Sequence, residues 1–338
     1  MVRVSAGLSS ACAAREAGRG TVRGHAQNVI GKKMDLMNST VDGVRAVVFD
    51  ISGTVLDYGS RGPVAALIEL FARHGINLTT QEARAPMGAH KRDHIKALLA
   101  DAAVGLRWET LHGTPPGPGV LDELYAEFEP LQTEVVKDYC DVIPGVPAVM
   151  AELRRRNIKV ASTTGFARGM IRDLIPLAAA GGYSPDLWVC PDDVGQGRPA
   201  PWMIFHAARK LGVYPPRTFV KVGDTPTDVA EGHAAGAWVV SVVRSGNEVG
   251  LSEAELKALP AAERAARLSA AQARLAACEP HYVIDSVADL MPVIDTISAR
   301  IARGESPGAA DFRPRFDSPP AVARAAAAQW VGRGAGDC

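Results

Sequence analysis

The chain has 338 residues, of which 47% are hydrophobic and 22% are charged, a composition typical of globular proteins. Its 37 basic and 37 acidic residues give a net charge of zero, which excludes binding to nucleic acid or anionic membranes through a strong overall field. No apolar run approaches the roughly 18 residues of a membrane span. We therefore expect a cytoplasmic protein without a nucleic-acid or membrane partner.

The five cysteines are scattered and form no CxxC pair, so neither a zinc site nor a disulfide framework is expected. Reduced thiols are the usual state of such cysteines in the cytosol. They are Cys12, Cys140, Cys190, Cys278 and Cys338.

Both ends of the chain differ in composition from the middle. Residues 1–43 are rich in Ala, Gly, Ser and Arg, which predicts a disordered extension or an early start codon ahead of Met34 or Met37. An organellar transit peptide has a similar composition, but these residues show no clear amphipathic face. Residues 304–338, with their PP and GAGDC segments, are predicted to be a disordered tail.

The first predicted strand is residues 47–49, and it leads directly into Asp50. Gly53 and Thr54 follow in a tight turn, for which glycine is well suited. A carboxylate at the carboxyl end of an apolar strand lies where open α/β sheets bind ligands. Asp50 alone is equally well explained as a helix cap or a turn residue.

Helical patterns dominate the next block of about 80 residues. Apolar residues have helical spacing over residues 63–75, and further helices are expected over 88–102 and 120–136. Strand patterns are scarce in this block. We therefore predict a helical insertion over residues 61–142.

Short apolar strands then alternate with helices, which is typical of a doubly wound parallel sheet with right-handed crossovers. The predicted α/β core comprises residues 44–60 and 143–303. Its later strands are expected at 158–162, 187–190, 218–222, 238–243 and 282–285.

Polar residues follow four of the predicted strands. Asp50 follows the first, residues 162–165 (STTG) follow the second, Arg198 lies beyond the third, and Asp224 and Asp228 follow the fourth. Because the carboxyl ends of parallel strands meet at one edge of the sheet, these side chains are expected to lie together.

This set of residue types suits attack on phosphorus. Asp50 can act as a nucleophile that forms an aspartyl-phosphate. A hydroxyl of Thr163 or Thr164 and the backbone N–H groups of the turn at Gly165 can hold phosphoryl oxygens. Arg198 adds a cation against developing negative charge.

The three aspartates supply hard oxygen ligands of the kind that Mg²⁺ prefers. Asp50, Asp224 and Asp228 are therefore the candidate metal ligands. Taken one at a time, Asp224 and Asp228 can equally be helix caps, Arg198 a surface ion pair and the STTG run a turn. Their joint occurrence favours a site.

FDxxGT, a Ser/Thr-Gly turn, a basic residue and GDxxxD together resemble the haloacid dehalogenase superfamily, over residues 45–300. The resemblance implies a Rossmann-like core with a helical cap inserted just after the first motif. It also implies that Ser52 offers its backbone carbonyl to the metal and that Ser52 and Gly53 contact the phosphoryl group.

Phosphatases of this superfamily carry an acidic residue where this chain has Ser52. A serine hydroxyl is a far weaker acid, so an alkoxide leaving group would lose its general-acid help. The sequence therefore favours a leaving group that is not an alkoxide.

The predicted second helix of the insertion carries a further candidate. Met87, Lys91 and His94 are spaced i, i+4, i+7 and are expected to share one helical face, whereas Arg92 and Lys96 are expected in solvent. Facing a phosphoryl site, Lys91 can have a lowered pKa and form a Schiff base. A surface lysine and a buried structural histidine are the simpler alternatives.

PMGxxKxDH, GRPxPWM and STTG together resemble the phosphonoacetaldehyde hydrolase family, also called phosphonatases. The resemblance implies that Lys91 condenses with the aldehyde of phosphonoacetaldehyde and that Asp50 takes the phosphoryl group. His94 is then a candidate proton relay, and Met87 a substrate contact. A Mg²⁺ cofactor and a homodimer formed through the cap are also implied.

Phe166 departs from the family pattern, in which this position is usually Tyr, and Ile51 and Ser52 replace Trp and Ala. These changes leave a related carbonyl phosphonate open as the substrate. A phosphomonoesterase of the same superfamily and an inactive metabolite-binding protein stay open as well, whereas a dehalogenase is disfavoured because GDxxxD suits a metal.

Overall fold

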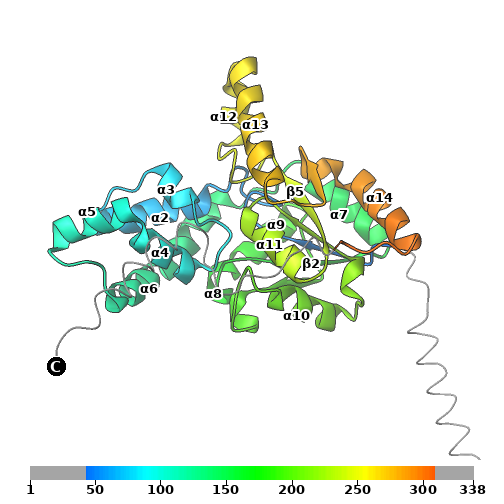
Figure 1. Cartoon of the computed structure of the whole chain (residues 1–338), viewed down its shortest axis with the longest axis horizontal. Helices are drawn as coiled ribbons and strands as arrows, with labels where there is room; N and C mark the ends of the chain where they lie inside the picture. Colours follow the sequence, from blue (N-terminus) through cyan, green and yellow to red (C-terminus); the bar gives the residue numbers. More distant parts are fainter. Residues whose placement is uncertain (1–42, 309–338) are drawn as a thin grey trace, which may run out of the picture. The chain divides into compact units, whose positions relative to one another are not determined.

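The computed structural model describes residues 43–308 (Figure 1). The predictions made for residues 1–42 and 309–338 lie outside this part of the chain. In the described residues, six parallel strands form one sheet in the order β3-β2-β1-β4-β5-β6. Their bounds are β1 Ala46–Phe49, β2 Lys159–Thr163, β3 Leu187–Val189, β4 Phe219–Gly223, β5 Trp238–Val242 and β6 Tyr282–Ile284. The predicted doubly wound parallel sheet is confirmed.

The order of the strands reverses between β1 and β4. From β1 the chain moves outward to β2 and β3, and then it returns to the other side of β1 for β4, β5 and β6. Such a reversal opens a crevice at the carboxyl ends of the two central strands, where doubly wound sheets bind ligands. The fold therefore puts the residues after β1 and β4 in the ligand-binding position.

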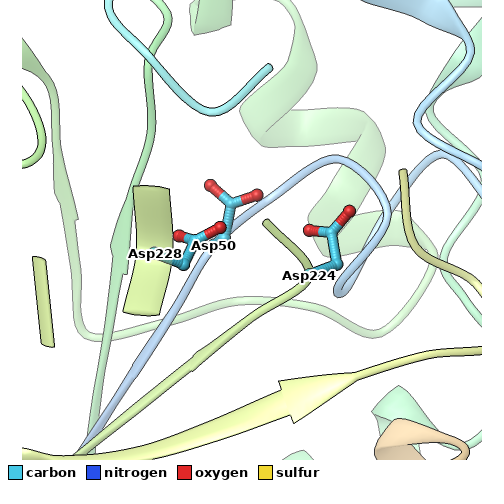
Figure 2. Close-up of side chains that lie close together, drawn as sticks. All are labelled: Asp50, Asp224 and Asp228. Atoms are coloured by element: carbon cyan, nitrogen blue, oxygen red, sulfur yellow. The ribbon is translucent and has the colours of Figure 1, made fainter. Parts of the chain in front are cut away.

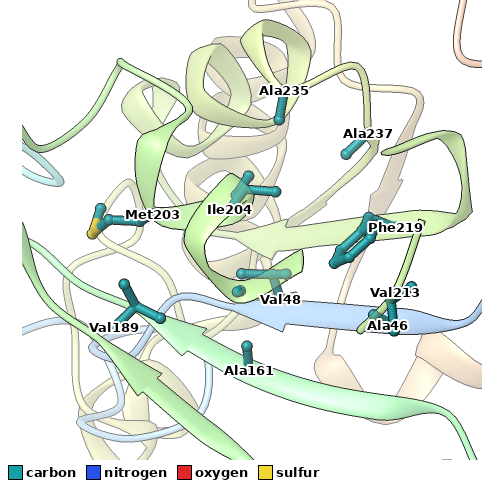
Figure 3. Packing of buried hydrophobic residues seen from close by; sticks show 11 residues of the cluster. Ala46, Val48, Ala161, Val189, Met203, Ile204, Val213, Phe219, Ala235 and Ala237 are labelled. Atoms are coloured by element: carbon teal, nitrogen blue, oxygen red, sulfur yellow. The ribbon is translucent and has the colours of Figure 1, made fainter. Parts of the chain in front are cut away.

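The central strands are apolar because helices cover both faces of a parallel sheet. On one face, Ala46 and Val48 of β1 and Phe219 of β4 pack against Met203 and Ile204 (Figure 3). The last two side chains belong to α10 (Trp202–Leu211), whose buried residues recur at helical spacing. This packing holds β1 and β4 in register and so fixes where the two strands end.

The first five α-helices after β1 lie where the sequence predicts the helical insertion. They are α2 Gly62–Arg73, α3 Thr80–Arg84, α4 Lys91–Ala100, α5 Ala102–His112 and α6 Pro118–Val135. The boundaries 61–142 predicted for the insertion enclose them. Helix α2 packs against α6 and buries Leu67 and Leu70.

The remaining helices lie before β2, between the later strands and after β6. They are η1 Val136–Tyr139, α7 Val146–Arg155, α8 Arg168–Ile171, α9 Leu174–Ala180, η2 Pro191–Asp193, η3 Pro216–Thr218, α11 Pro226–Ala234, α12 Glu253–Ala258, α13 Ala261–Ala276, η4 Val287–Asp289 and α14 Leu290–Ala302. None of the helices between residues 43 and 308 is both long and apolar enough to cross a membrane.

The helix predicted over residues 88–102 is wrong at its start and its end. Gly88 has φ +89°, a left-handed conformation that a helix cannot contain, so α4 begins only at Lys91. At the other end, Asp101 is extended and caps α5 by accepting from the N–H groups of Ala103 and Val104. Met87 therefore lies in a turn and does not share a helical face with Lys91.

Burial of α2 provides a test of the fold. Leu70→Ala should lower the free energy of unfolding by about 2–5 kcal/mol, because the fully buried side chain leaves a cavity. Leu106→Ala on α5 is the matched control, since Leu106 is 65% exposed and the change should be within about 0.5 kcal/mol. Urea denaturation measures both, and equal losses would contradict the packing of α2.

Candidate active site

Three buried aspartates meet at the point where the strand order reverses (Figure 2). Asp50 follows β1, Asp224 follows β4, and Asp228 lies in the first turn of α11. The backbone N–H of Asp50 donates to Val222 of β4 at 2.9 Å, which fixes Asp50 beside that strand. One carboxylate oxygen from each residue lies within 4.8 Å of the other two, so the group is able to hold a metal ion.

Asp224 is held by the turn that follows β1. Its Oδ1 accepts from Thr54 Oγ1 at 2.8 Å, and its Oδ2 accepts from the backbone N–H of Asn247 at 2.7 Å. Gly53 has φ +86°, and a Cβ atom there would lie 2.3 Å from Asp224 Oδ2. Gly53 therefore makes room for Asp224, and its N–H donates to the carbonyl of Leu56 within the turn.

Asp228 combines a capping role with a contact to the cations of the site. Its Oδ2 accepts from the N–H and the hydroxyl of Thr225, which form a capping box at the start of α11. Its Oδ1 lies 2.9 Å from Arg198 Nη1 and 3.0 Å from Lys221 Nζ. The capping alternative for Asp228 is thus correct, and it leaves one oxygen to the site.

Arg198 is buried and bridges several acidic groups, so the surface ion pair considered for it is wrong. Its Nη1 lies 2.7 Å from Asp50 Oδ1, and its Nε lies 2.9 Å from Glu231 Oε2. Its Nη2 donates to the carbonyl and the hydroxyl of Thr163 at 2.6 and 2.8 Å. The hydroxyl of Thr163 is therefore engaged by Arg198, and Thr163 is not among the residues that line the pocket.

Lys221 and Glu231 complete this network and were not identified from the sequence. Lys221 Nζ lies 2.9 Å from Glu231 Oε2 and donates to Thr163 Oγ1 at 2.8 Å, and both charged side chains are fully buried. A charged residue inside the otherwise apolar strand FVKVG was a usable signal, because Lys is almost never fully buried unless paired. Glu231 gave no signal, since it lies on a helix where an acidic residue is common.

The network of Asp50, Asp224, Asp228, Glu231, Arg198 and Lys221 carries two more negative than positive charges when all its groups are ionised. Burial raises the pKa of Asp50 against the opposing effect of Arg198. Burial and the nearby charges of Asp50 and Asp228 raise the pKa of Asp224 well above its usual range. The pKa of Asp228 is lowered because Arg198 and Lys221 outweigh its burial. A divalent cation among the three aspartates would balance this charge, so the donor set fits a metal of the hard, oxygen-binding type.

A pocket of about 290 Å³ lies beside this network, of which Asp50 and Arg198 line its wall. Its walls come from the sheet edge and from the cap helices and turns. They are Asp50, Ser52, Ser60, Pro63, Met87, Gly88, Lys91, Thr164, Gly165, Phe166, Arg198 and Thr225. Eight of the predicted site residues are among them, whereas Gly53, Thr163, His94, Asp224 and Asp228 are not.

Lys91 brings an amine from the cap into this pocket. The side chain is buried, and burial lowers the pKa of Lys91 to about 8, although the charge of Asp50 opposes the shift. Nζ lies 3.6 Å from Met87 Sδ and 5.1 Å from the centre of the Phe166 ring. The surface-lysine alternative is therefore wrong, and a sizeable fraction of this amine is neutral near pH 7–8.

Lys91 is also fixed through its backbone. Its N–H donates to the carbonyl of Gly165 at 3.2 Å, which joins the start of α4 to the turn after β2. A Cβ atom on Gly165 would lie 2.3 Å from the carbonyl oxygen of Ala89. Only glycine allows this close approach between the cap turn and the core turn.

His94 is buried behind the pocket wall. Its Nε2 lies 3.0 Å from the carbonyl of Ala83, so Nε2 carries the proton and donates. Nδ1 is buried and has no hydrogen-bond partner among the described residues. Burial and the nearby Lys91 hold the pKa of His94 well below its usual value, so the ring stays neutral near pH 7.

The described residues match known protein families over most of their length. A model described as haloacid dehalogenase-like hydrolase matches residues 44–236, and a second HAD-hydrolase-like model matches residues 195–290. The chain therefore belongs to the haloacid dehalogenase-like hydrolases.

Curated relatives indicate a more specific family within the haloacid dehalogenase-like hydrolases. The chain is 46% identical to a phosphonoacetaldehyde hydrolase of Paraburkholderia phytofirmans over 78% of this chain and 99% of the relative. It is 43% identical to a phosphonoacetaldehyde hydrolase of Nitratidesulfovibrio vulgaris over 78% and 94% of the two chains. A crystal structure of a phosphonoacetaldehyde hydrolase like protein from Oleispira antarctica matches with a TM-score of 0.77 and 39% identity, covering 78% and 96% of the two chains. Within its class, the protein belongs to the phosphonoacetaldehyde hydrolase family.

Removing the cation at position 221 tests the buried network. Lys221→Met should lower the free energy of unfolding by about 3–5 kcal/mol, because Asp228 and Glu231 lose a buried partner. Lys257→Met on α12 is the control, since its i,i+4 pair with Glu253 is exposed and should be worth about 0.3–0.5 kcal/mol. Urea unfolding followed by circular dichroism measures both; a Lys221 variant as stable as the control would refute the network.

Proposed function

We propose that this protein hydrolyses the C–P bond of phosphonoacetaldehyde to give acetaldehyde and phosphate. One observation carries the proposal: a buried amine with a pKa of about 8, Lys91, lines the same pocket as the carboxylate Asp50. An amine and a carboxylate in one pocket suit a substrate with an aldehyde at one end and a phosphoryl group at the other. The names of the curated relatives agree with this substrate.

The first proposed step uses the amine. Neutral Lys91 adds to the aldehyde carbon, and the adduct takes up a proton and loses water, which gives a protonated imine. The imine is an electron sink for the bond between carbon and phosphorus. Met87 and Phe166 pack around Nζ and keep it out of water, which favours the neutral amine.

The second proposed step uses the carboxylate. Asp50 attacks phosphorus, the C–P bond breaks, and its electron pair moves into the imine to give an enamine. Arg198 holds one oxygen of Asp50 and offers positive charge beside the phosphoryl group. Thr164 and Gly165 line the pocket and are proposed to contact phosphoryl oxygens.

We propose Mg²⁺ as the metal at Asp50, Asp224 and Asp228, with the backbone carbonyl of Ser52 as a further ligand. Carboxylate and carbonyl oxygens are the donors that this ion prefers. When bound, Mg²⁺ would supply positive charge that offsets the charge on the transferring phosphoryl group.

Release completes the reaction. Water attacks the aspartyl-phosphate to free phosphate and Asp50, while the enamine takes up a proton at carbon and hydrolysis of the resulting imine frees acetaldehyde and Lys91. His94 is proposed to move a proton to or from Lys91, because its neutral ring keeps an unused lone pair on Nδ1. One water is consumed overall.

Ser52 supports a carbon leaving group. An alkoxide needs a general acid beside the scissile bond, and Ser52 lines the pocket where that acid would stand. An enamine needs no such acid. Phe166 contacts Lys91 with its ring and lacks the hydroxyl group of the Tyr that is usual at this position in the family. Because of this difference, a carbonyl phosphonate related to phosphonoacetaldehyde is kept as an alternative substrate. A cytoplasmic location and a homodimer formed through the cap also stay proposals.

Reduction with borohydride tests the imine. Borohydride added with phosphonoacetaldehyde should inactivate the protein and leave an alkylated Lys91, which peptide mass spectrometry can locate. Lys91→Met should form no adduct and should lower phosphate release by several orders of magnitude, because the electron sink is lost.

Lys96→Met is the matched control, since Lys96 is exposed on the same helix and both adduct and activity should persist. Phosphate release without any adduct on Lys91 would overturn the imine mechanism.

The pH dependence of imine formation provides a separate test. Only the neutral amine attacks the aldehyde, so the rate of adduct formation should rise with pH up to about 8, the pKa of Lys91, and level off above it. His94 adds no second limb, because its pKa lies well below this range. Stopped-flow or quenched borohydride trapping gives the profile; a rate that is flat from pH 6 to 9 would contradict a lysine with a lowered pKa.

A further inference from the structure

Arg84, the last residue of α3, ties the cap to two loops of the core. Its Nη1 donates to the carbonyl oxygens of Gly59 at 2.9 Å and Ser60 at 3.3 Å, in the segment that leads into α2. Its Nη2 donates to the carbonyl of Gly250 at 3.0 Å, in the loop that follows β5. One half-buried guanidinium therefore joins three segments that are distant in the sequence.

The same guanidinium reaches the metal-binding group through Asn247. Arg84 Nη1 donates to Asn247 Oδ1 at 3.0 Å and lies 3.4 Å from its carbonyl oxygen. The backbone N–H of Asn247 donates to Asp224 Oδ2 at 2.7 Å. A single residue thus separates the cap arginine from a carboxylate of the metal-binding group.

The backbone of Arg84 reaches the other half of the site. Its carbonyl accepts from the N–H of Met87 at 3.0 Å and closes the turn that leads to Lys91. Met87 in turn lies 3.6 Å from Lys91 Nζ through its sulfur atom. Arg84 is therefore bonded both to the turn that presents the amine and to the loop that holds Asp224.

The loop after β5 is shaped to admit this side chain. Gly250 has φ +68°, and a Cβ atom there would lie 2.8 Å from Arg84 Nε and 2.9 Å from Cζ. Any larger residue at this position would press on the guanidinium in addition to adopting a strained backbone.

We propose that Arg84 is a positioning residue that couples the cap to the metal site, holding Asn247 so that its N–H orients Asp224. The inference rests on the metal site of the proposed function. Partners that orient ligands commonly change metal affinity by about 10–100-fold when they are removed. Arg84 should therefore influence metal binding although it contacts no metal ligand directly.

Metal binding without substrate is the direct test. In a titration of the full-length protein followed by electron paramagnetic resonance of Mn²⁺, Arg84→Ala should raise the Kd for Mn²⁺ about tenfold or more. Methylguanidinium should restore part of the affinity in Arg84→Ala, and Arg84→Lys should be intermediate, because a single ammonium cannot reach all the acceptors.

A second variant keeps the test decisive if Arg84→Ala folds poorly. Asn247→Ala keeps the backbone N–H to Asp224 but removes the side-chain acceptor, so it should also raise the Kd for Mn²⁺. Both changes act on Asp224 through the same hydrogen bond between Arg84 and Asn247. The double variant should therefore bind Mn²⁺ no more weakly than Arg84→Ala. Additive losses would overturn the coupling.

Arg73→Ala is the matched control, since Arg73 is exposed and pairs with Glu69 on the surface of α2, so its loss should leave the Kd for Mn²⁺ unchanged. A Kd within about twofold of wild type in both folded Arg84→Ala and Asn247→Ala would refute the inference. Wild-type protein that binds Mn²⁺ yet releases no phosphate from phosphonoacetaldehyde would instead refute the proposed function alone.

Discussion

The ion pair between Arg198 and Asp50 is the interaction on which the rest of the site depends. It holds Oδ1 of Asp50 2.7 Å from Arg198 Nη1, and both residues line the pocket. Both groups are buried, and an ion pair removed from water stabilises a protein only when its remaining hydrogen-bonding groups are also satisfied. Glu231 and Thr163 meet this need at the other nitrogens of Arg198. Asp50, the proposed nucleophile, is thus held by Arg198, and Arg198 is in turn held by Glu231 and Thr163.

The charge balance of this network also relates the stability of the fold to the three aspartates that could hold a metal. The side chains of Arg198 and Lys221 cannot balance four ionised carboxylates, and among residues 43–308 Asp224 forms no ion pair within 4 Å. Burial and the charges of Asp50 and Asp228 accordingly raise the pKa of Asp224. A divalent cation would supply the missing positive charge, and burial of these carboxylates without a metal would carry an electrostatic cost at the edge of the sheet. Binding of metal should therefore be linked to stability as well as to chemistry.

Residues next to strand ends were predictable from the sequence because a strand and the turn after it are local patterns. Asp50, Asp224 and Arg198 were found in this way, and the expectation that they gather at one edge of the sheet followed from general rules of parallel sheets. Glu231 and Arg84 were missed because their importance arises only from packing between distant segments. The spacing of Met87 and Lys91 suggested one helical face, and the left-handed Gly88 made that wrong although the two side chains still meet.

The proposed chemistry is divided between Asp50 in the core and Lys91 in the predicted cap, and the lowered pKa of the amine depends on both parts. A lysine in water has a pKa near 10.4, so almost none of it is neutral at pH 7. Burial against Phe166 and the turn at Gly165, both in the core, accompanies the lower pKa of about 8. The pKa of this amine is therefore lowered where Lys91 is buried between the predicted cap and the core. The contact that forms the pocket also removes Lys91 from water. Formation of the pocket and the lowered pKa of Lys91 therefore have the same physical cause, which is burial of the amine.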